Sequence, residues 1–168
     1  MKFKYCPFCG NELEAKEIGD EGLMPFCVNC QRPYFDWFGL CTLSAVFNEF
    51  NEIALLKQEY VSKTNWVLVA GYIKNGETLE ETAAREVYEE TGQIVKNIRY
   101  ISSYYHEKRE LLMIGFKCDV EKKDFNKSIE VDNIQWFNIN EALNLLREGS
   151  IGQLLIKNIK EKMNSIII

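Results

Sequence analysis

The segment from residue 71 to residue 92 constrains the fold of this chain more than any other part of the sequence. It predicts a helix over residues 78–91 on which Glu86, Glu89 and Glu90 share one side, because they fall within an arc of roughly 100°. Carboxylates at this spacing repel one another unless a cation neutralises them. Hard ions such as Mg²⁺ and Mn²⁺ prefer oxygen ligands of high negative charge, and these ions support chemistry on phosphate groups.

The residues that frame the three glutamates mark where this helix begins and ends. Gly71 and Gly76 bracket a loop before the helix, and Thr78 is a residue type that commonly caps a first turn. Gly92 stands where a glycine commonly ends a helix. A glutamate-rich helix face is more often simply solvated, so it is this frame that favours a metal site.

The whole string resembles the Nudix box, with the order Gly71-x5-Glu77-x7-Arg85-Glu86-x2-Glu89-Glu90-x-Gly92. The resemblance covers residues 42–164. It implies an α/β fold, a Nudix α/β/α sandwich with a mixed sheet. The family pattern expects an apolar residue directly after the last glycine, where this chain has Gln93. We expect this departure to affect packing at the helix end and not the metal ligands.

The resemblance also implies a role for each position of the box. Glu86, Glu89, Glu90 and the carbonyl of Gly71 would bind Mg²⁺ or Mn²⁺. A water would then attack a phosphorus of a pyrophosphate linked to a nucleoside. Glu77 would steady the loop before the helix, and Arg85 would orient Glu89 or Glu90. The predicted catalytic residues are Glu77, Arg85, Glu86, Glu89 and Glu90.

Glu130 is a further candidate ligand for the same metal. It lies six residues before Trp136, in the pair Trp136-Phe137. Many Nudix proteins carry a glutamate near a Trp-Phe strand that reaches the metals from a neighbouring loop. The alternative is a solvated loop glutamate, which is the usual state of an acidic residue before a strand.

Four of the six cysteines form two Cys-x-x-Cys pairs with 17 residues between them: Cys6, Cys9, Cys27 and Cys30. This spacing predicts a structural zinc site in which four thiolates close a tetrahedral shell. A disulfide framework suits secreted proteins, and a redox pair expects a following helix in a βαβ unit, which the sequence does not show here. A ribbon of roughly 35 residues is too small to fold on its own apolar core, so zinc would supply the missing free energy.

These patterns divide the chain into a small zinc ribbon, residues 1–38, and a Nudix hydrolase domain, residues 39–168. In the larger part we expect strands over residues 43–47, 53–58, 66–73, 98–105, 111–120 and 134–138. After the helix at residues 78–91, we expect Asn140 to cap a helix that ends near residue 148. Ser150 should cap a final helix to about residue 164.

Composition excludes several classes of function. The net charge of −5 disfavours a broad nucleic-acid surface. No apolar run approaches the roughly 18 residues that a membrane span needs, so no membrane partner is expected. The first residues lack the apolar core of a secretion signal. We therefore expect a cytoplasmic protein.

A zinc ribbon joined to a Nudix domain is similar to the NADH pyrophosphatase group, whose members split the dinucleotide into mononucleotides and in some cases remove NAD caps from RNA. That group carries a motif close to Ser-Gln-Pro-Trp-Pro-Phe-Pro. In the corresponding run of this chain, residues 103–109, only Ser103 matches. A proline-rigid aromatic loop is replaced by a charged one, so the resemblance supports the domain layout more than a preference for NADH.

Replacement residues in this run are candidates for substrate binding: Tyr104, Tyr105, Lys108 and Arg109. The tyrosines could stack on a base, and the two cations could contact phosphates. The alternative is that one tyrosine faces the core and the other the solvent, because neighbours in a strand point to opposite faces.

Taken together, the sequence predicts a metal-dependent pyrophosphohydrolase that cleaves a nucleoside diphosphate derivative such as NADH, NAD or ADP-ribose. The alternative is a Nudix-like sensor that binds a nucleotide without hydrolysing it. Such modules often lose glutamates of the box, whereas every acidic position is filled here. The expected partner is a small nucleotide, with nucleic acid only as a capped RNA end, and the resemblance suggests a homodimer.

Overall fold

The computed structural model describes residues 3–165, with side chains through Met163. It contains two compact units, which divide between Phe38 and Gly39. The smaller unit is a three-stranded antiparallel sheet of β1 (Glu14–Glu17), β2 (Leu23–Cys27) and β3 (Arg32–Pro33), with a short turn of 3₁₀ helix, η1 (Gly19–Glu21), between the first two strands.

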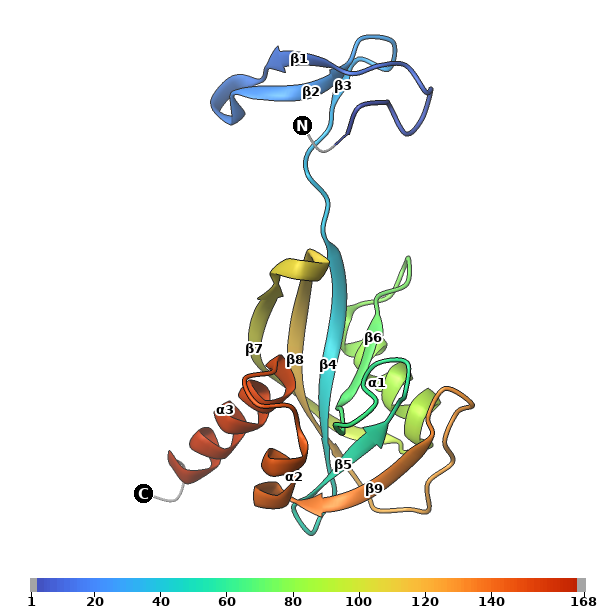
Figure 1. Cartoon of the computed structure of the whole chain (residues 1–168), viewed down its shortest axis with the longest axis vertical. Helices are drawn as coiled ribbons and strands as arrows, with labels where there is room; N and C mark the ends of the chain where they lie inside the picture. The colour runs from blue at the N-terminus through green and yellow to red at the C-terminus, as the bar shows by residue number, and fades with distance from the viewer. Residues whose placement is uncertain (1–2, 166–168) are drawn as a thin grey trace. The chain divides into compact units, whose positions relative to one another are not determined.

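The larger unit is built on a six-stranded mixed sheet (Figure 1). Strands run in the order β7-β8-β4-β5-β9, and β6 pairs with β4; β4 and β8 are parallel, and the other pairs are antiparallel. The strand bounds are β4 Gly39–Phe47, β5 Glu52–Lys57, β6 Val69–Tyr72, β7 Val95–His106, β8 Leu111–Val120 and β9 Asn133–Asn138. A 3₁₀ turn, η2 (Glu107–Arg109), joins β7 to β8.

Helices cover both faces of this sheet, which confirms the predicted α/β/α sandwich (Figure 1). Helix α1 (Leu79–Thr91) packs Ala83 and Val87 on one face. Helices α2 (Ile139–Leu145) and α3 (Ile151–Ser165) pack residues such as Leu155 and Ile156 on the other. Along β4, alternate side chains enter the two cores, Val46 on the α1 side and Ala45 on the other, because successive side chains of a strand point to opposite faces.

Local signals fixed the ends of α1 as expected. The Thr78 hydroxyl accepts from the Glu81 backbone N–H, and the Glu81 carboxylate accepts from the Thr78 backbone N–H, which together form a capping box. Gly92 ends the helix in the left-handed conformation, with φ of 73°. Ser150 likewise caps α3, because its hydroxyl accepts from the Gln153 backbone N–H.

Several boundaries differ from the sequence-based expectation: β4 begins at Gly39 and not at residue 43, β7 begins at Val95 and not at residue 98, and α2 ends at Leu145 and not near residue 148. Two further differences have a local cause. The cap of α2 is Asn138 and not Asn140: the Asn138 side chain accepts from the Glu141 backbone N–H at 3.0 Å, because the chain enters the helix directly from β9. Strand β6 is shorter than the predicted 66–73, since Trp66 bridges Leu146 instead of continuing the pairing with β4. Among the described residues, no helix is long and apolar enough to cross a membrane.

Candidate active site on helix α1

Arg85 ties the loop before α1 to the helix. Its Nε and Nη2 donate to the Glu77 carboxylate at 2.6 and 2.9 Å, and Nη2 also reaches the Tyr72 carbonyl. Glu77 accepts in addition from the Thr82 hydroxyl and the Lys74 backbone N–H. These donors, Arg85 foremost, lower the pKa of Glu77 to about 2, so this carboxylate stays ionised and holds the loop in place.

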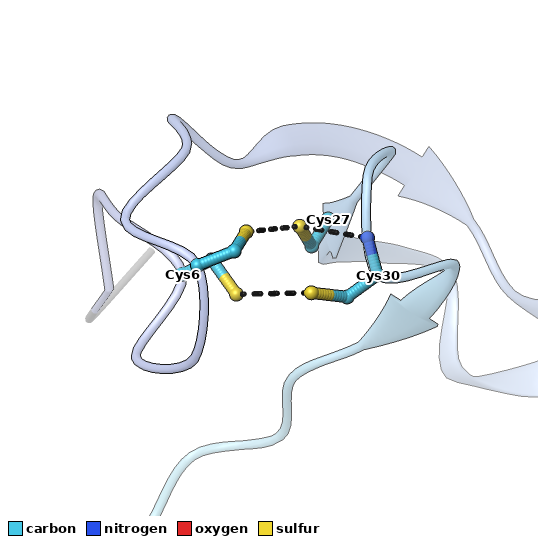
Figure 2. A group of neighbouring side chains, drawn as sticks. Cys6, Cys27 and Cys30 are labelled. Carbon is cyan, nitrogen blue, oxygen red and sulfur yellow. Dashed lines mark hydrogen bonds between the residues drawn. The ribbon is translucent and has the colours of Figure 1, made fainter.

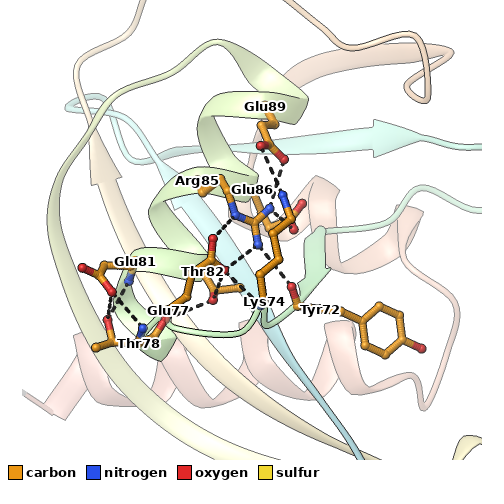
Figure 3. A network of polar contacts seen from close by, with 9 residues as sticks. All are labelled: Tyr72, Lys74, Glu77, Thr78, Glu81, Thr82, Arg85, Glu86 and Glu89. Carbon is orange, nitrogen blue, oxygen red and sulfur yellow. Dashed lines mark hydrogen bonds and ion pairs between the residues drawn. The ribbon is translucent and has the colours of Figure 1, made fainter.

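The same guanidinium faces two of the three box glutamates (Figure 3). Arg85 Nη1 donates to Glu86 at 2.5 Å and to Glu89 at 3.0 Å. Lys74 Nζ lies 3.7 Å from the other oxygen of Glu89. Positive charge beside these carboxylates therefore comes from both the loop and the helix, and burial raises the pKa of Glu86 although Arg85 opposes that rise.

Gly71 makes room for Glu86. A Cβ at position 71 would lie 1.9 Å from Glu86 Cδ and 2.0 Å from Oε1. Gly71 pairs with Thr42 within the sheet, so the strand backbone cannot easily move away. A side chain at position 71 would therefore push the Glu86 carboxylate aside.

We expect the Gly71→Ala variant to lose activity with little loss of stability. Since the displaced atoms belong to a flexible side chain, unfolding free energy should change by about 1 kcal/mol or less, whereas metal-dependent turnover should fall about 10- to 100-fold. Gly152→Ala in α3 is the matched control, because its Cβ would meet Leu68 only at ordinary contact distance, 3.5 Å. Equal turnover in the two variants would contradict the role of Gly71.

Glu90 is the most buried carboxylate of the box, with 5% of its surface exposed. Its Oε1 accepts from Gln58 Nε2 at 2.7 Å, whereas Oε2 is buried without a hydrogen-bond partner. Burial raises the pKa of Glu90 to about 7, and the charges of Glu86 and Glu130 add to that rise. An unpartnered buried carboxylate oxygen costs free energy unless a cation or a proton meets it.

This pKa predicts how stability depends on pH when Mg²⁺ and Mn²⁺ are absent. The folded state holds the Glu90 proton up to about pH 7, whereas the unfolded chain loses it near 4.5. The contribution of Glu90 to stability is therefore fully present below about pH 4.5 and is lost as the pH rises from there through 7, by up to about 3 kcal/mol. We expect denaturant unfolding to show the gap between the parent and Glu90→Gln widening in favour of the variant from pH 5 to 8; a gap independent of pH would contradict the assignment.

Glu130 lies in the same cavity as the box glutamates. This cavity, of about 320 Å³, is lined by Glu86, Glu89, Glu90, Ser128, Ile129 and Glu130. The long connection between β8 and β9 therefore brings a fourth carboxylate to the helix, as the sequence predicted for its position. Whether Glu130 binds metal stays a prediction.

The donor set fits a hard divalent ion. The cavity offers carboxylate oxygens from α1 and from the β8–β9 connection, and one of them, Glu90 Oε2, is buried without a partner. Among the described residues, the ligand atoms of the four cysteines all lie within 4.8 Å of one another, and no cluster of carboxylates meets the same criterion. The carboxylates instead stand further apart around Arg85, so binding an ion would require Glu86 and Glu89 to turn from the guanidinium.

Two residues of the site carried no signal in the sequence. Gln58, 4% exposed, directly follows strand β5 and donates to Glu90 from 32 positions away along the chain. Tyr72 directly follows Gly71, and its ring is 60% exposed and points away from the polar network (Figure 3). The exposed ring of Tyr72 could be recognised as part of the site only after the structure had placed the loop that follows it.

Residues 103–109 form the C-terminal end of β7 and the 3₁₀ turn η2 that follows it. Tyr104 faces α3, where its hydroxyl accepts from Asn158 Nδ2 at 2.8 Å and from the Ser102 hydroxyl at 2.6 Å. Tyr105 is on the opposite face and 55% exposed, and Lys108 and Arg109 are exposed in η2. The two tyrosines thus do not form one stacking platform.

The four cysteines of the smaller unit converge, with their sulfur atoms within 4.8 Å of one another. Figure 2 shows Cys6, Cys27 and Cys30 of this cluster. All four are free thiols; Cys9 and Cys27 sulfurs lie 3.5 Å apart and those of Cys6 and Cys30 3.8 Å, too far for disulfide bonds of about 2.05 Å. Four thiols in this arrangement fit a tetrahedral zinc ion. The small core around them contains Leu13 and Tyr34.

The sheet, the capped helix with its glutamates and the bracketing glycines define a protein of the Nudix class. The NUDIX domain family model matches residues 38–156, and the chain belongs to this family. Over 94% of its length the chain is 31% identical to the NAD-capped RNA hydrolase NudC of Vibrio parahaemolyticus, and over 90% it is 33% identical to that of Photobacterium profundum. It spans 59% and 56% of the lengths of these two relatives.

Solved structures share the fold. A NUDIX hydrolase from Nitrosomonas europaea superposes with a TM-score of 0.73 at 24% identity, covering 97% of this chain and 92% of that one. The NUDIX domain of Shewanella oneidensis NrtR, complexed with ADP ribose, gives a TM-score of 0.66 at 17% identity, covering 77% of this chain and 90% of that one.

Proposed function

We propose that this chain is a divalent-metal-dependent pyrophosphohydrolase that cleaves a nucleoside diphosphate derivative containing an ADP-ribosyl group. The observation that carries the proposal is the buried, unpartnered Glu90 oxygen in a cavity shared with three more carboxylates. The NudC relatives act on NAD-capped RNA, and NAD contains the ADP-ribose that the NrtR domain binds.

In this proposal Glu86, Glu89, Glu90 and Glu130, with the Gly71 carbonyl, would hold Mg²⁺ or Mn²⁺. The ion supplies charge neutralisation on the phosphates and acidifies the attacking water. Glu77 and Arg85 keep the backbone of the loop and the helix in one arrangement, so that only the side chains of Glu86 and Glu89 have to turn toward the ion. Lys74, exposed beside Glu89, is placed to meet a phosphate oxygen.

Tyr72 is a candidate aromatic ring for the base of the substrate. It is exposed, stands at the end of β6 and directly follows Gly71. Stacking of a base on such a ring contributes about 1–3 kcal/mol. Tyr105, Lys108 and Arg109 remain candidates for a more distant part of the substrate.

We further propose that residues 1–38 bind zinc as a structural ribbon and that residues 39–168 form the catalytic domain. A cytoplasmic location, where thiols stay reduced, suits a four-thiolate zinc site. A homodimer is the proposed assembly, and light scattering on the full chain tests it.

A substrate panel on the purified full chain tests the proposed activity. NADH, NAD, ADP-ribose, nucleotide sugars, nucleoside triphosphates and NAD-capped RNA would be incubated with Mg²⁺ or Mn²⁺, and the products separated by chromatography. We expect release of a mononucleotide from the ADP-ribosyl compounds. Nucleotide binding without turnover of any compound would support the sensor instead.

A further inference from the structure

Gln93 joins the end of helix α1 to the connection between β8 and β9. Its side chain is fully buried. Its Nε2 donates to the Lys123 carbonyl at 3.1 Å and to the Asp124 carbonyl at 3.3 Å, and its Oε1 accepts from the Lys123 backbone N–H at 3.2 Å. The amide thus uses donor and acceptor together on one stretch of backbone, which an apolar residue cannot do.

The neighbouring residues extend this contact. The Thr91 carbonyl accepts from the Asn126 backbone N–H at 3.0 Å. A Cβ at Gly92 would lie 2.7 Å from Asn126 Cβ and 2.9 Å from its backbone nitrogen, so the segment passes close against the helix end. Residues 123–126 are therefore held by the last turn of the helix that carries the box glutamates.

A second anchor follows Glu130. The Asp132 backbone N–H donates to the Lys57 carbonyl at 2.8 Å, and the Asp132 carboxylate accepts from the Glu59 backbone N–H at 2.7 Å. Between these anchors, residues 128–130 line the cavity of the box glutamates, and Ile129 is fully exposed. The position of Glu130 in the cavity thus depends on what holds the two flanking stretches.

We propose that Gln93 is a positioning residue that sets Glu130 against the glutamates of α1 and thereby tunes the affinity of the cavity for a divalent ion. This inference deepens the proposed function and rests on it. A carboxylate on an ordered segment binds an ion without a further loss of conformational entropy, whereas one on a loosened segment must be ordered on binding. Gln93 touches neither ion nor substrate and acts through residues 123–126.

The test compares Gln93→Met with Gln153→Met in the full chain. Methionine keeps the length of glutamine and removes its hydrogen bonds. Gln153 is the matched control: it is also a buried glutamine that bonds backbone on both sides, donating to Leu143 and accepting from Gly149, but it joins α2 to α3 on the other face of the sheet. The readouts are Mn²⁺ binding by electron paramagnetic resonance, hydrogen exchange of residues 121–132, and kcat and KM.

For Gln93→Met we expect the Mn²⁺ dissociation constant to rise about tenfold and kcat/KM to fall about tenfold, with faster exchange over residues 121–132. Gln153→Met should change the Mn²⁺ constant less than twofold. In a Glu130→Gln background, Gln93→Met should have little further effect on Mn²⁺ binding, because both changes remove the same contribution. Equal Mn²⁺ affinity in parent and Gln93→Met, or full additivity with Glu130→Gln, would overturn the proposal.

If Gln93→Met does not fold, Gln93→Asn, which keeps the amide but is one methylene shorter, is measured in the same way. Mn²⁺ binding and exchange do not require turnover. A chain that hydrolyses no compound would therefore contradict the proposed function while the positioning role is still decided by these two readouts.

Discussion

Glu90→Gln is expected to lower metal-dependent turnover by at least about 1000-fold while the fold remains intact. Glu90 has a buried carboxylate oxygen without a hydrogen-bond partner, and glutamine cannot offer an anionic ligand there. The side chains are nearly the same size, and the amide can still accept from Gln58 Nε2 through its oxygen. The loss should therefore appear in chemistry and ion affinity rather than in packing.

The measurement is steady-state turnover of the best compound of the panel as Mg²⁺ or Mn²⁺ is varied. Glu80→Gln is the matched control, because Glu80 is an exposed glutamate in the first turn of the same helix. We expect it to retain turnover within about twofold, as surface substitutions usually do. A Glu90→Gln variant as active as the parent would contradict the assignment of the metal site to this face of α1.

Cys6→Ser is expected to abolish zinc binding and to unfold the ribbon while the unit from Gly39 onwards stays folded. Cys6 is 3% exposed and its sulfur lies 3.0 Å from the Tyr34 hydroxyl, so it belongs to both the thiol cluster and the small core. A unit of this size buries too little apolar surface to fold without its metal. Zinc content should fall from about one ion per chain to almost none.

Zinc is measured by atomic absorption, and the ribbon by hydrogen exchange of residues 3–38. Cys118→Ala is the matched control, since it removes a buried thiol from the core of the larger unit and should leave zinc content unchanged. Retention of a full equivalent of zinc by Cys6→Ser would count against the four-cysteine site.

Much of the architecture followed from short-range rules. The capping residues Thr78 and Ser150, the glycine stop at Gly92 and the bounds of β8 depend on neighbours within a few positions, so local pattern was sufficient. The cap of α2 was misplaced by two residues, because both Asn138 and Asn140 satisfy the local rule. The end of β9 decides between them.

The sequence by itself determined the set of ionisable groups, their spacing on one helix and the pairing of the cysteines into two knuckles. Only the tertiary structure decided what each buried or half-buried polar group meets: Glu86 against Gly71, Glu90 with Gln58, and Gln93 with the backbone of residues 123–124. The physical reason is the range of the interactions. Helix periodicity and capping act within about one turn, whereas a buried donor or acceptor must be satisfied by whichever distant segment the packing brings to it.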